Sequence, residues 1–270
     1  MRYKLIDEIE LGSKNALLKI NILQYYINNG ENSLADLAKE MNLSIPTVSK
    51  LVNELIEEGY VIDFGKQETN GGRRPSIYGL NPDSGYFVGV DLKRFRINLA
   101  LINFKGEMVD SKLSIPFNYE NTQESFDTVC KIIDDFVNQL SIPKSKILSV
   151  GVNISGRVNT QTGMSYSYYF FKEEPLTEIF QQRLGLHVTI DNDSRAMAYG
   201  EFMKGDVKSE KNVLFVNVSW GLGLGIIVDG KLYYGKSGFS GEFGHISAFD
   251  NEVLCHCGKK GCLETQASGS

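Results

Sequence analysis

The sequence lacks any apolar run long enough to cross a bilayer, and its first eight residues mix charged and apolar side chains. A membrane-spanning helix needs about 20 consecutive apolar residues, and a secretory signal peptide needs an uninterrupted apolar core. We therefore expect neither a membrane anchor nor a signal peptide. The expected compartment is the cytoplasm.

Cysteine is also scarce, with four residues in 270, which is too few for a dense disulfide framework and fits a reducing compartment. Cys130 stands alone within a helical pattern, so we interpret it as a buried apolar residue and not as a reactive thiol. The other three cysteines fall within eight residues near the end of the chain.

Positive charge is not in excess either: 28 Lys and Arg face 33 Asp and Glu, giving a net charge of −5. The molecule as a whole therefore carries no sign of nucleic-acid binding, and any such binding must come from a local patch. Its length is sufficient for a small domain followed by a larger one.

What the chain does contain is a cluster with metal-ligand spacing. His245 is followed by Cys255, Cys257 and Cys262, with glycines beside two of the cysteines that allow a tight backbone. A Cys₃His set suits a tetrahedral structural zinc ion. The alternative is one disulfide plus a free thiol, which the absence of a secretory signal disfavours.

The first eighty residues predict three helices. Apolar positions over 14–28 indicate the first helix, which ends at Gly30. Ser33 caps a second helix over 34–41, and Ser44 caps a third, with Pro46 tolerated in its first turn.

The third helix buries Val48, Leu51, Val52 and Leu55, and its other face shows short polar groups suited to base edges. Extended runs at 60–64 and 76–80 flank a tip, residues 71–75, with two adjacent arginines. This pattern predicts a winged helix-turn-helix over 1–80; a three-helix partner-binding module is the alternative. The candidate DNA-binding residues are Thr47, Ser49, Lys50, Asn53, Arg73 and Arg74.

The net charge of the first eighty residues weakens the DNA-binding interpretation. Residues 1–80 carry nine Lys and Arg against eleven Asp and Glu, a sum of −2. Binding should therefore be modest for one domain, and we expect a homodimer or higher homo-oligomer to supply affinity.

A turn-rich segment, 81–85, marks a domain boundary. Beyond it, strand patterns alternate with helical patterns, which predicts an α/β fold. Strands are expected over 86–92, 96–102, 106–109, 147–152, 187–191, 213–219 and 221–231, and helices over about 122–140 and 192–201.

Three motifs resemble the ROK family of sugar-responsive repressors and sugar kinases: Gly-Glu-Phe-Gly-His at 241–245, Cys-x-Cys-Gly-x-x-Gly-Cys-x-Glu at 255–264, and Asp-Asn-Asp-x-x-Ala-x-Ala at 191–198. The resemblance implies an actin-like (ribonuclease H-like) domain after the winged helix, with a first lobe over 86–205 and a second over 206–270. Relatives continue further, so we expect a fragment of a longer protein whose second lobe is incomplete and whose sheet at 213–234 exposes an apolar face.

The resemblance also implies site residues. Asn192 and Asp193 would bind sugar hydroxyls, with Asp193 at the general-base position, and Glu242, His245 and Glu264 would complete the site. Two alternatives stay open: Asp193 as a simple N-cap, and Glu242 as a solvated turn carboxylate. His256 is interpreted as a bystander and His187 as structural.

Family kinases place glycines after the aspartate of the first strand, where backbone N–H groups hold ATP phosphates. This chain has Lys93, Arg94 and Phe95 there, and Trp220 stands in the second phosphate motif. Without the glycines the backbone cannot approach a phosphate closely, so we expect no ATP binding.

Together these features predict a sugar-responsive transcriptional regulator, specifically a repressor, with double-stranded operator DNA and a sugar or sugar phosphate as ligands. One alternative is an ATP-dependent sugar kinase of the glucokinase or N-acetylhexosamine kinase type with an accessory DNA-binding domain. Another is a zinc-stabilised sugar-sensing module without a DNA role. Departures from the family at 155–157 and 166–171 leave the sugar open.

Overall fold

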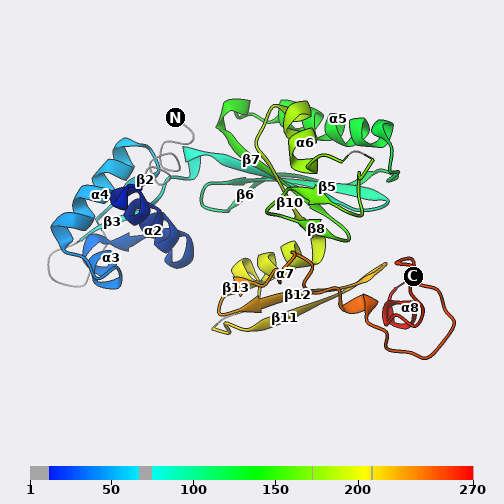
Figure 1. Ribbon diagram of the computed structural model, residues 1–270. Helices are drawn as coiled ribbons and strands as arrows, with labels where there is room; N and C mark the ends of the chain where they lie inside the picture. The colour runs from blue at the N-terminus through cyan, green and yellow to red at the C-terminus, as the bar shows by residue number, and fades with distance from the viewer. Residues whose placement is uncertain (1–11, 67–74, 172, 208, 270) are drawn as a thin grey trace. The chain divides into compact units, whose positions relative to one another are not determined.

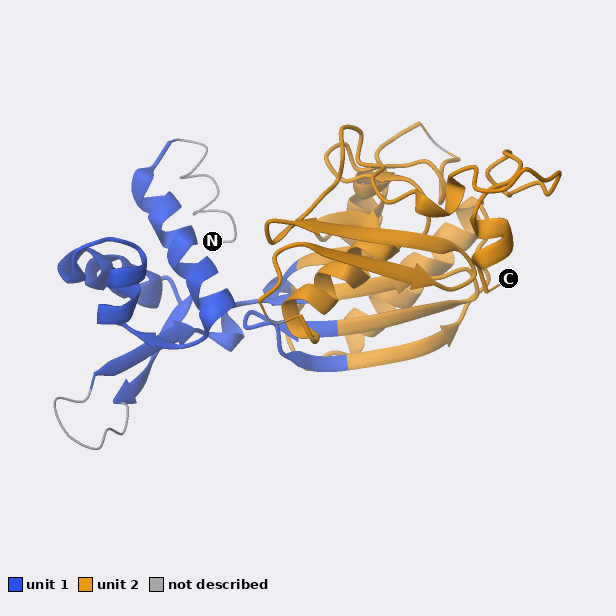
Figure 2. Cartoon of the chain, turned by 90° about the horizontal axis from the view of Figure 1, so that it is seen from below, with its two compact units in different colours: residues 1–87, 101–110, 145–148 blue, residues 88–100, 111–144, 149–270 orange. Residues whose placement is uncertain are grey.

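The computed structural model describes residues 12–66, 75–171, 173–207 and 209–269 (Figure 1). They form two units, coloured separately in Figure 2: residues 1–87, 101–110 and 145–148 in the first, and residues 88–100, 111–144 and 149–270 in the second. Among the described residues no helix combines the length and apolarity that crossing a membrane requires.

In its described residues the first unit has three helices over 14–57, each entered through a serine. The Oγ atoms of Ser13, Ser33 and Ser44 accept hydrogen bonds from backbone N–H groups three residues later, as good N-caps do. The sequence-based prediction of all three helices is confirmed. They are α2 (Lys14–Asn29), α3 (Leu34–Glu40) and α4 (Ile45–Glu57).

A small antiparallel sheet completes this domain, with strand order β1-β3-β2. Its strands are β1 (Asn32–Ser33), β2 (Val61–Lys66) and β3 (Ser76–Leu80). The expected wing tip, with Arg73 and Arg74, lies outside the described residues. The predicted apolar stripe of α4 is confirmed, since Val48, Leu51, Val52 and Leu55 are all buried in the core.

One charged residue lies inside this core. Lys19 is 4% exposed, and its Nζ lies 2.9 Å from Glu54 Oε2 and 2.8 Å from Glu58 Oε1, so it joins α2 to α4. Burial alone would lower the pKa of the Lys19 ammonium, but its hydrogen bonds to Glu58 and Glu54 outweigh burial and hold that pKa above the ordinary value.

Replacing Lys19 with alanine should therefore destabilise the winged helix by roughly 3 kcal/mol, because two carboxylates lose their shared cation at a buried position. Urea unfolding followed by circular dichroism would measure this. Lys39→Ala, which removes an exposed lysine from α3, is the matched control and should change stability by less than about 0.5 kcal/mol. Equal effects of the two changes would contradict the prediction.

The first unit also contains the turn between β5 (Arg96–Asn103) and β6 (Met108–Pro116). The Phe104 ring lies 5.9 Å from the Tyr60 ring and packs against the winged-helix core. Lys105 Nζ lies 2.6 Å from Glu31 Oε1 and 5.5 Å from the centre of the Phe64 ring. The hydrogen bond from Lys105 lowers the pKa of Glu31. This turn is thus an integral part of the unit that holds the winged helix.

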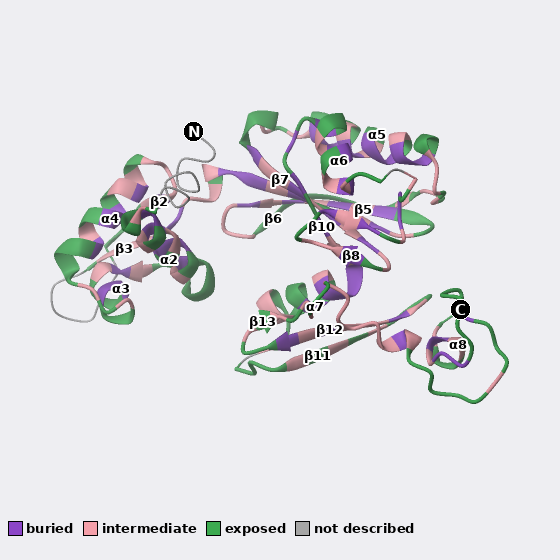
Figure 3. Ribbon diagram, viewed as in Figure 1, coloured by how far each residue is buried: buried purple, intermediate pink, exposed green. Residues whose placement is uncertain are grey.

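A five-stranded sheet of order β10-β7-β4-β5-β6 follows, with β10 parallel to β7. Helices α5 and α6 lie together on one side of it (Figure 1). The elements are β4 (Tyr86–Leu92), β7 (Ile147–Ile154), β10 (Val188–Asn192), α5 (Gln123–Gln139) and α6 (Leu176–Leu184). Strands β4, β5 and β7 each contain several buried apolar residues, and Figure 3 shows the buried parts of β5 and β7 in purple.

Cys130 lies inside α5 with no exposed surface, as expected for an apolar role. Burial raises the pKa of its thiol to about 12, so the thiolate that a nucleophile would need is disfavoured.

Helix α7 (Asp193–Lys204) packs on an antiparallel sheet of order β11-β12-β13. Its strands are β11 (Val213–Val218), β12 (Leu222–Val228) and β13 (Lys231–Leu232). Leu214, Val216 and Val218 alternate along the outer strand β11 and are 67%, 51% and 62% exposed. The expected exposed apolar face is therefore present.

The remaining elements are short. A two-stranded sheet joins β8 (Val158–Asn159) and β9 (Met164–Ser165). Single turns form η1 (Pro82–Ser84), η2 (Lys144–Lys146), η3 (Phe243–His245) and α8 (Glu264–Ala267). The last two flank the cysteine cluster and position its ligands.

Candidate functional site

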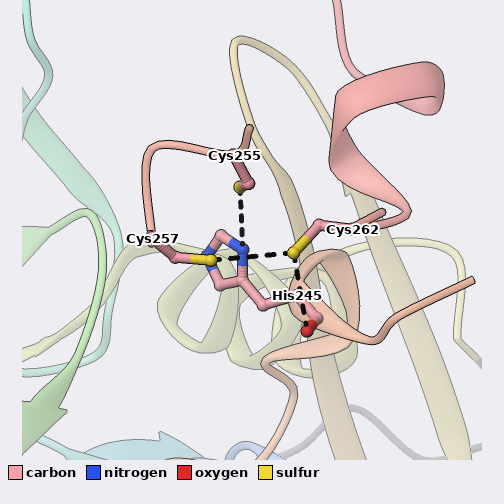
Figure 4. Close-up of side chains that lie close together, drawn as sticks. All are labelled: His245, Cys255, Cys257 and Cys262. Atoms are coloured by element: carbon pink, nitrogen blue, oxygen red, sulfur yellow. Dashed lines mark hydrogen bonds between the residues drawn. The ribbon is translucent and has the colours of Figure 1, made fainter. Parts of the chain in front are cut away.

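The four predicted metal ligands come together in the second unit (Figure 4). Cys255 Sγ lies 3.6 Å from His245 Nδ1, and Cys257 Sγ lies 3.6 Å from Cys262 Sγ. All four donor atoms fall within 4.8 Å of one another, and none of the cysteines is in a disulfide. The alternative of a disulfide plus a free thiol is not what the structure contains.

This donor set fits zinc. Tetrahedral bonds of about 2.3 Å to sulfur and about 2.0 Å to nitrogen place neighbouring ligand atoms about 3.5–3.8 Å apart, and the two 3.6 Å separations given above fall there. Thiolates and an imidazole are the ligands that structural zinc prefers. Cys255 and Cys262 are buried whereas Cys257 is exposed, so one side of the set faces solvent.

Two glycines make the close backbone approach around this set possible. Gly241 has φ 85°, and a Cβ there would lie 1.9 Å from Leu224 O. Gly261 has φ 72°, and its Cβ would lie 2.0 Å from Phe249 O. Side chains are excluded at both positions by space and by backbone conformation. The glycines of the Gly-Glu-Phe-Gly-His and cysteine motifs therefore shape the cluster directly.

Glu264 begins the short helix α8 and lies beside the cluster. Its Oε2 accepts a hydrogen bond of 2.8 Å from Leu222 N, and its Oε1 lies 3.0 Å from His256 Nδ1 and 4.0 Å from His245 Nδ1. Glu264 is 7% exposed, so its carboxylate is held in a fixed position. His256 is exposed, as expected of a solvent-facing side chain, and it contacts the Glu264 carboxylate.

Asn192, and not Asp193, is the N-cap of α7. Asn192 Oδ1 accepts from the N–H groups of Ser194 and Arg195, at 2.9 and 3.1 Å, and its Nδ2 donates to Gly156 O. The interpretation of Asp193 as a simple cap is therefore wrong. Asp193 is instead a buried carboxylate in the first turn of the helix.

Asp193 is held by a hydroxyl and a cation. Ser155 Oγ donates to Asp193 Oδ2 over 2.8 Å, and Lys93 Nζ lies 3.3 Å from the same oxygen. Lys93 Nζ also lies 3.3 Å from Asp91 Oδ1. The sequence did not reveal this arrangement, because Lys93 and Asp193 are 100 residues apart and only the fold joins them.

Arg195 connects three segments of the same region through its hydrogen bonds. Sequence reasoning did not identify it as a site residue. It is 2% exposed; its Nε donates to Asp191 Oδ1 over 2.7 Å, and its terminal nitrogens donate to Gly238 O and Val158 O over 2.7 and 3.2 Å. Its i, i+4 spacing from Asp191 was the available signal. The bond to Gly238 holds the loop that leads into the 241–245 motif.

The start of β12 contacts Glu264 and lies close to Ser194, the residue after Asp193. Leu222 N donates to Glu264, and a Cβ at Gly223 would lie 2.1 Å from Ser194 Oγ, next to Asp193. Glu242 is half-buried at the N-cap of η3, and its backbone O accepts from His245 N. One strand end therefore lies next to both Glu264 and the first turn of α7.

The two turns that replace the expected phosphate motifs touch one another. The Phe95 and Trp220 rings meet edge to face with centroids 5.8 Å apart, and both side chains are largely exposed. The backbone between Asp91 and Arg96 closes a turn in which Lys93 N donates to Arg96 O. This turn has no residue with positive φ, so it lacks the conformation of a glycine-rich phosphate loop.

The candidate DNA-binding side chains of α4 lie outside its buried stripe. Thr47, Lys50 and Asn53 are exposed and Ser49 is partly exposed. Thr47 Oγ1 also bonds Ser44 Oγ at 2.8 Å, within the helix cap. Lys50 Nζ lies 4.0 Å from Glu54, which leaves it available to another partner.

Comparison with known proteins gives two family matches. Residues 87–270 match the ROK family, and residues 17–62 match a family described as winged helix-turn-helix DNA-binding. The chain is 33% identical over 263 residues to the xylose repressor of Caldicellulosiruptor bescii, an alignment covering 96% of this chain and 66% of the repressor.

Two solved structures are similar. A ROK family transcriptional regulator, described as a homologue of the E. coli MLC protein, gives a TM-score of 0.74 with 27% identity over 93% of this chain and 65% of that one. A ROK glucokinase from Streptomyces griseus in complex with glucose and AMPPNP gives 0.59 with 29% identity over 68% of this chain and 58% of that one. The chain thus spans about two thirds of the two regulators' length.

Proposed function

The chain belongs to the ROK family, and on that premise we propose that it is a transcriptional repressor that binds operator DNA through its winged helix and responds to a sugar bound in its ROK domain. The observation that carries the proposal is the extent of similarity. The two regulators match 96% and 93% of this chain, whereas the glucokinase matches 68%. The regulator architecture is therefore the one that accounts for both halves of the sequence.

DNA contact is assigned to α4. Thr47, Ser49, Lys50 and Asn53 would meet base edges in the major groove, because short polar side chains near the start of a recognition helix reach them. Arg73 and Arg74 would contact phosphate or the minor groove from the wing. A homodimer would supply two such helices and the affinity that the acidic domain alone lacks.

Sugar contact is assigned to Asn192, Asp193, Glu242, His245 and Glu264. Carboxylates and amides pair with vicinal hydroxyls, and the buried carboxylates of Asp193 and Glu264 are already fixed by protein partners. The zinc held by His245, Cys255, Cys257 and Cys262 would hold Glu264 and His245 in place. It would supply no chemistry beyond this positioning.

Regulation, and not phosphoryl transfer, is the proposed outcome of sugar binding. Lys93 forms an ion pair with Asp193. The turn that contains Lys93 lacks the conformation of a phosphate-binding loop. Sugar binding would therefore change the spacing of the two recognition helices in a dimer and so alter operator affinity.

The test is an electrophoretic shift of the upstream region of the protein's own operon, with a panel of monosaccharides added. A specific shift that one sugar alters at least about tenfold is expected. A coupled ATP-turnover assay over the same panel separates the kinase alternative, which enzyme-like turnover would support. If the protein binds no DNA even at low salt, the result would favour a sugar-sensing module without a DNA role.

A further inference from the structure

Lys93 lies between two carboxylates that come from different segments. Its Nζ is 3.3 Å from Asp91 Oδ1 at the end of β4 and 3.3 Å from Asp193 Oδ2 at the start of α7. The side chain of Lys93 is 22% exposed and that of Asp193 is 11% exposed, so water screens this pairing only in part. Asn98 Nδ2 donates to Asp91 Oδ2 over 3.0 Å and fixes the other side of that carboxylate.

The formal charge of this triad is −1, because one ammonium faces two carboxylates. Arg195, a buried cation two residues after Asp193, is committed to Asp191 at 2.7 Å. Ser155 adds a hydroxyl but no charge. A negatively charged ligand group placed beside Asp193 would therefore meet surplus negative charge, and it could recruit Lys93 only by breaking an existing ion pair.

We propose that the triad Asp91–Lys93–Asp193 restricts the effector to uncharged sugars and rejects their phosphate esters. This rests on the proposed function, because it takes Asp193 as a sugar contact, and it names the class of sugar that the function left open. Lys93 acts as a resident cation. It holds Asp193 as a hydrogen-bond acceptor for a hydroxyl, and it is not available to a phosphate.

A charge series tests the proposal. The Lys93→Met variant gives the triad a charge of −2, the wild type has −1, and Asp91→Asn gives zero. Calorimetric titration would use matched pairs: xylose and xylose 5-phosphate, glucose and glucose 6-phosphate, N-acetylglucosamine and its 6-phosphate. For the pair that binds, the wild type should prefer the uncharged member by about tenfold or more, and this preference should rise in Lys93→Met and fall in Asp91→Asn.

Equal or tighter binding of the phosphate ester by the wild type would overturn the proposal, as would a preference that ignores the charge series. Binding of neither member of any pair would overturn the sugar-sensing function and the ligand class together. In that case the role of Lys93 as a resident cation must be tested by a measurement that does not depend on sugar binding.

Magnesium ions provide that test. In Lys93→Ala a carboxylate oxygen of Asp91 and one of Asp193 are left around a vacated cation position, and such oxygens suit Mg²⁺. Ten millimolar Mg²⁺ should raise the melting temperature of Lys93→Ala by about 2–4 °C and leave the wild type unchanged. The Lys93→Ala/Asp91→Asn double variant is the control and should lose the shift. An equal shift in the wild type would show that Lys93 does not fill this position.

Discussion

Replacing Cys262 with serine should abolish zinc binding and lower the melting temperature of the second unit by about 10 °C or more. Cys262 has no exposed surface, and its Sγ lies 3.6 Å from Cys257 Sγ within the ligand set. Loss of the metal would free the segment that carries Glu264, since Leu263 and Glu264 follow Cys262 directly. Metal analysis by inductively coupled plasma mass spectrometry and differential scanning calorimetry would measure the two effects.

Cys130→Ala is the matched control for this change. It also removes a buried thiol, but one that lies in α5 away from the ligand set, so the bound zinc should stay near one equivalent per chain while stability falls modestly. Full zinc content in Cys262→Ser would contradict the assignment. A wild-type protein isolated without zinc and with an oxidised cysteine pair would revive the disulfide alternative.

Replacing Lys50 and Asn53 together with alanine should weaken specific operator binding by about 100-fold or more. Each base contact is worth roughly 1–3 kcal/mol, and both side chains are exposed on the face of α4 opposite its core stripe. The fold should survive, because neither side chain is part of that core. Fluorescence anisotropy with a footprinted operator fragment and a scrambled duplex would separate specific from non-specific affinity.

The control for the recognition helix is Lys131→Ala, which removes an exposed lysine from α5 in the other unit. It should leave operator affinity within about twofold of the wild type, since Lys131 is not part of the winged helix. An operator affinity that is unchanged in the Lys50→Ala/Asn53→Ala variant would move DNA recognition away from α4. A loss of scrambled-duplex binding equal to the loss of operator binding would assign these residues to phosphate contact only.

Local chemistry accounts for the features that sequence reasoning placed correctly. The caps Ser33 and Ser44, the apolar stripe of α4 and the cysteine spacing all depend on residues within a few positions of one another. Helix α6 was not predicted, since it has no side-chain cap and follows Pro175. Its short amphipathic pattern was overshadowed by the aromatic run that precedes it.

The charged contacts inside the domains could not be predicted, because they join residues that are far apart in the sequence. Lys19 with Glu58 and Lys93 with Asp193 join positions 39 and 100 residues apart, so only the folded chain brings them together. By spacing alone each lysine would be read as an ordinary surface residue, because lysine is seldom buried without a partner. The candidate sugar site was identified by motif, but its ion pairs were not.

The β5–β6 turn has a practical consequence for protein engineering. Phe104 and Lys105 contribute packing and an ion pair to the winged helix although they follow it by more than 20 residues. A chimeric regulator made by grafting residues 12–85 onto a different sensor would leave Tyr60, Phe64 and Glu31 without these partners. Grafts that include residues 103–107 as well as the winged helix should retain the solubility and operator selectivity that the graft of residues 12–85 alone loses.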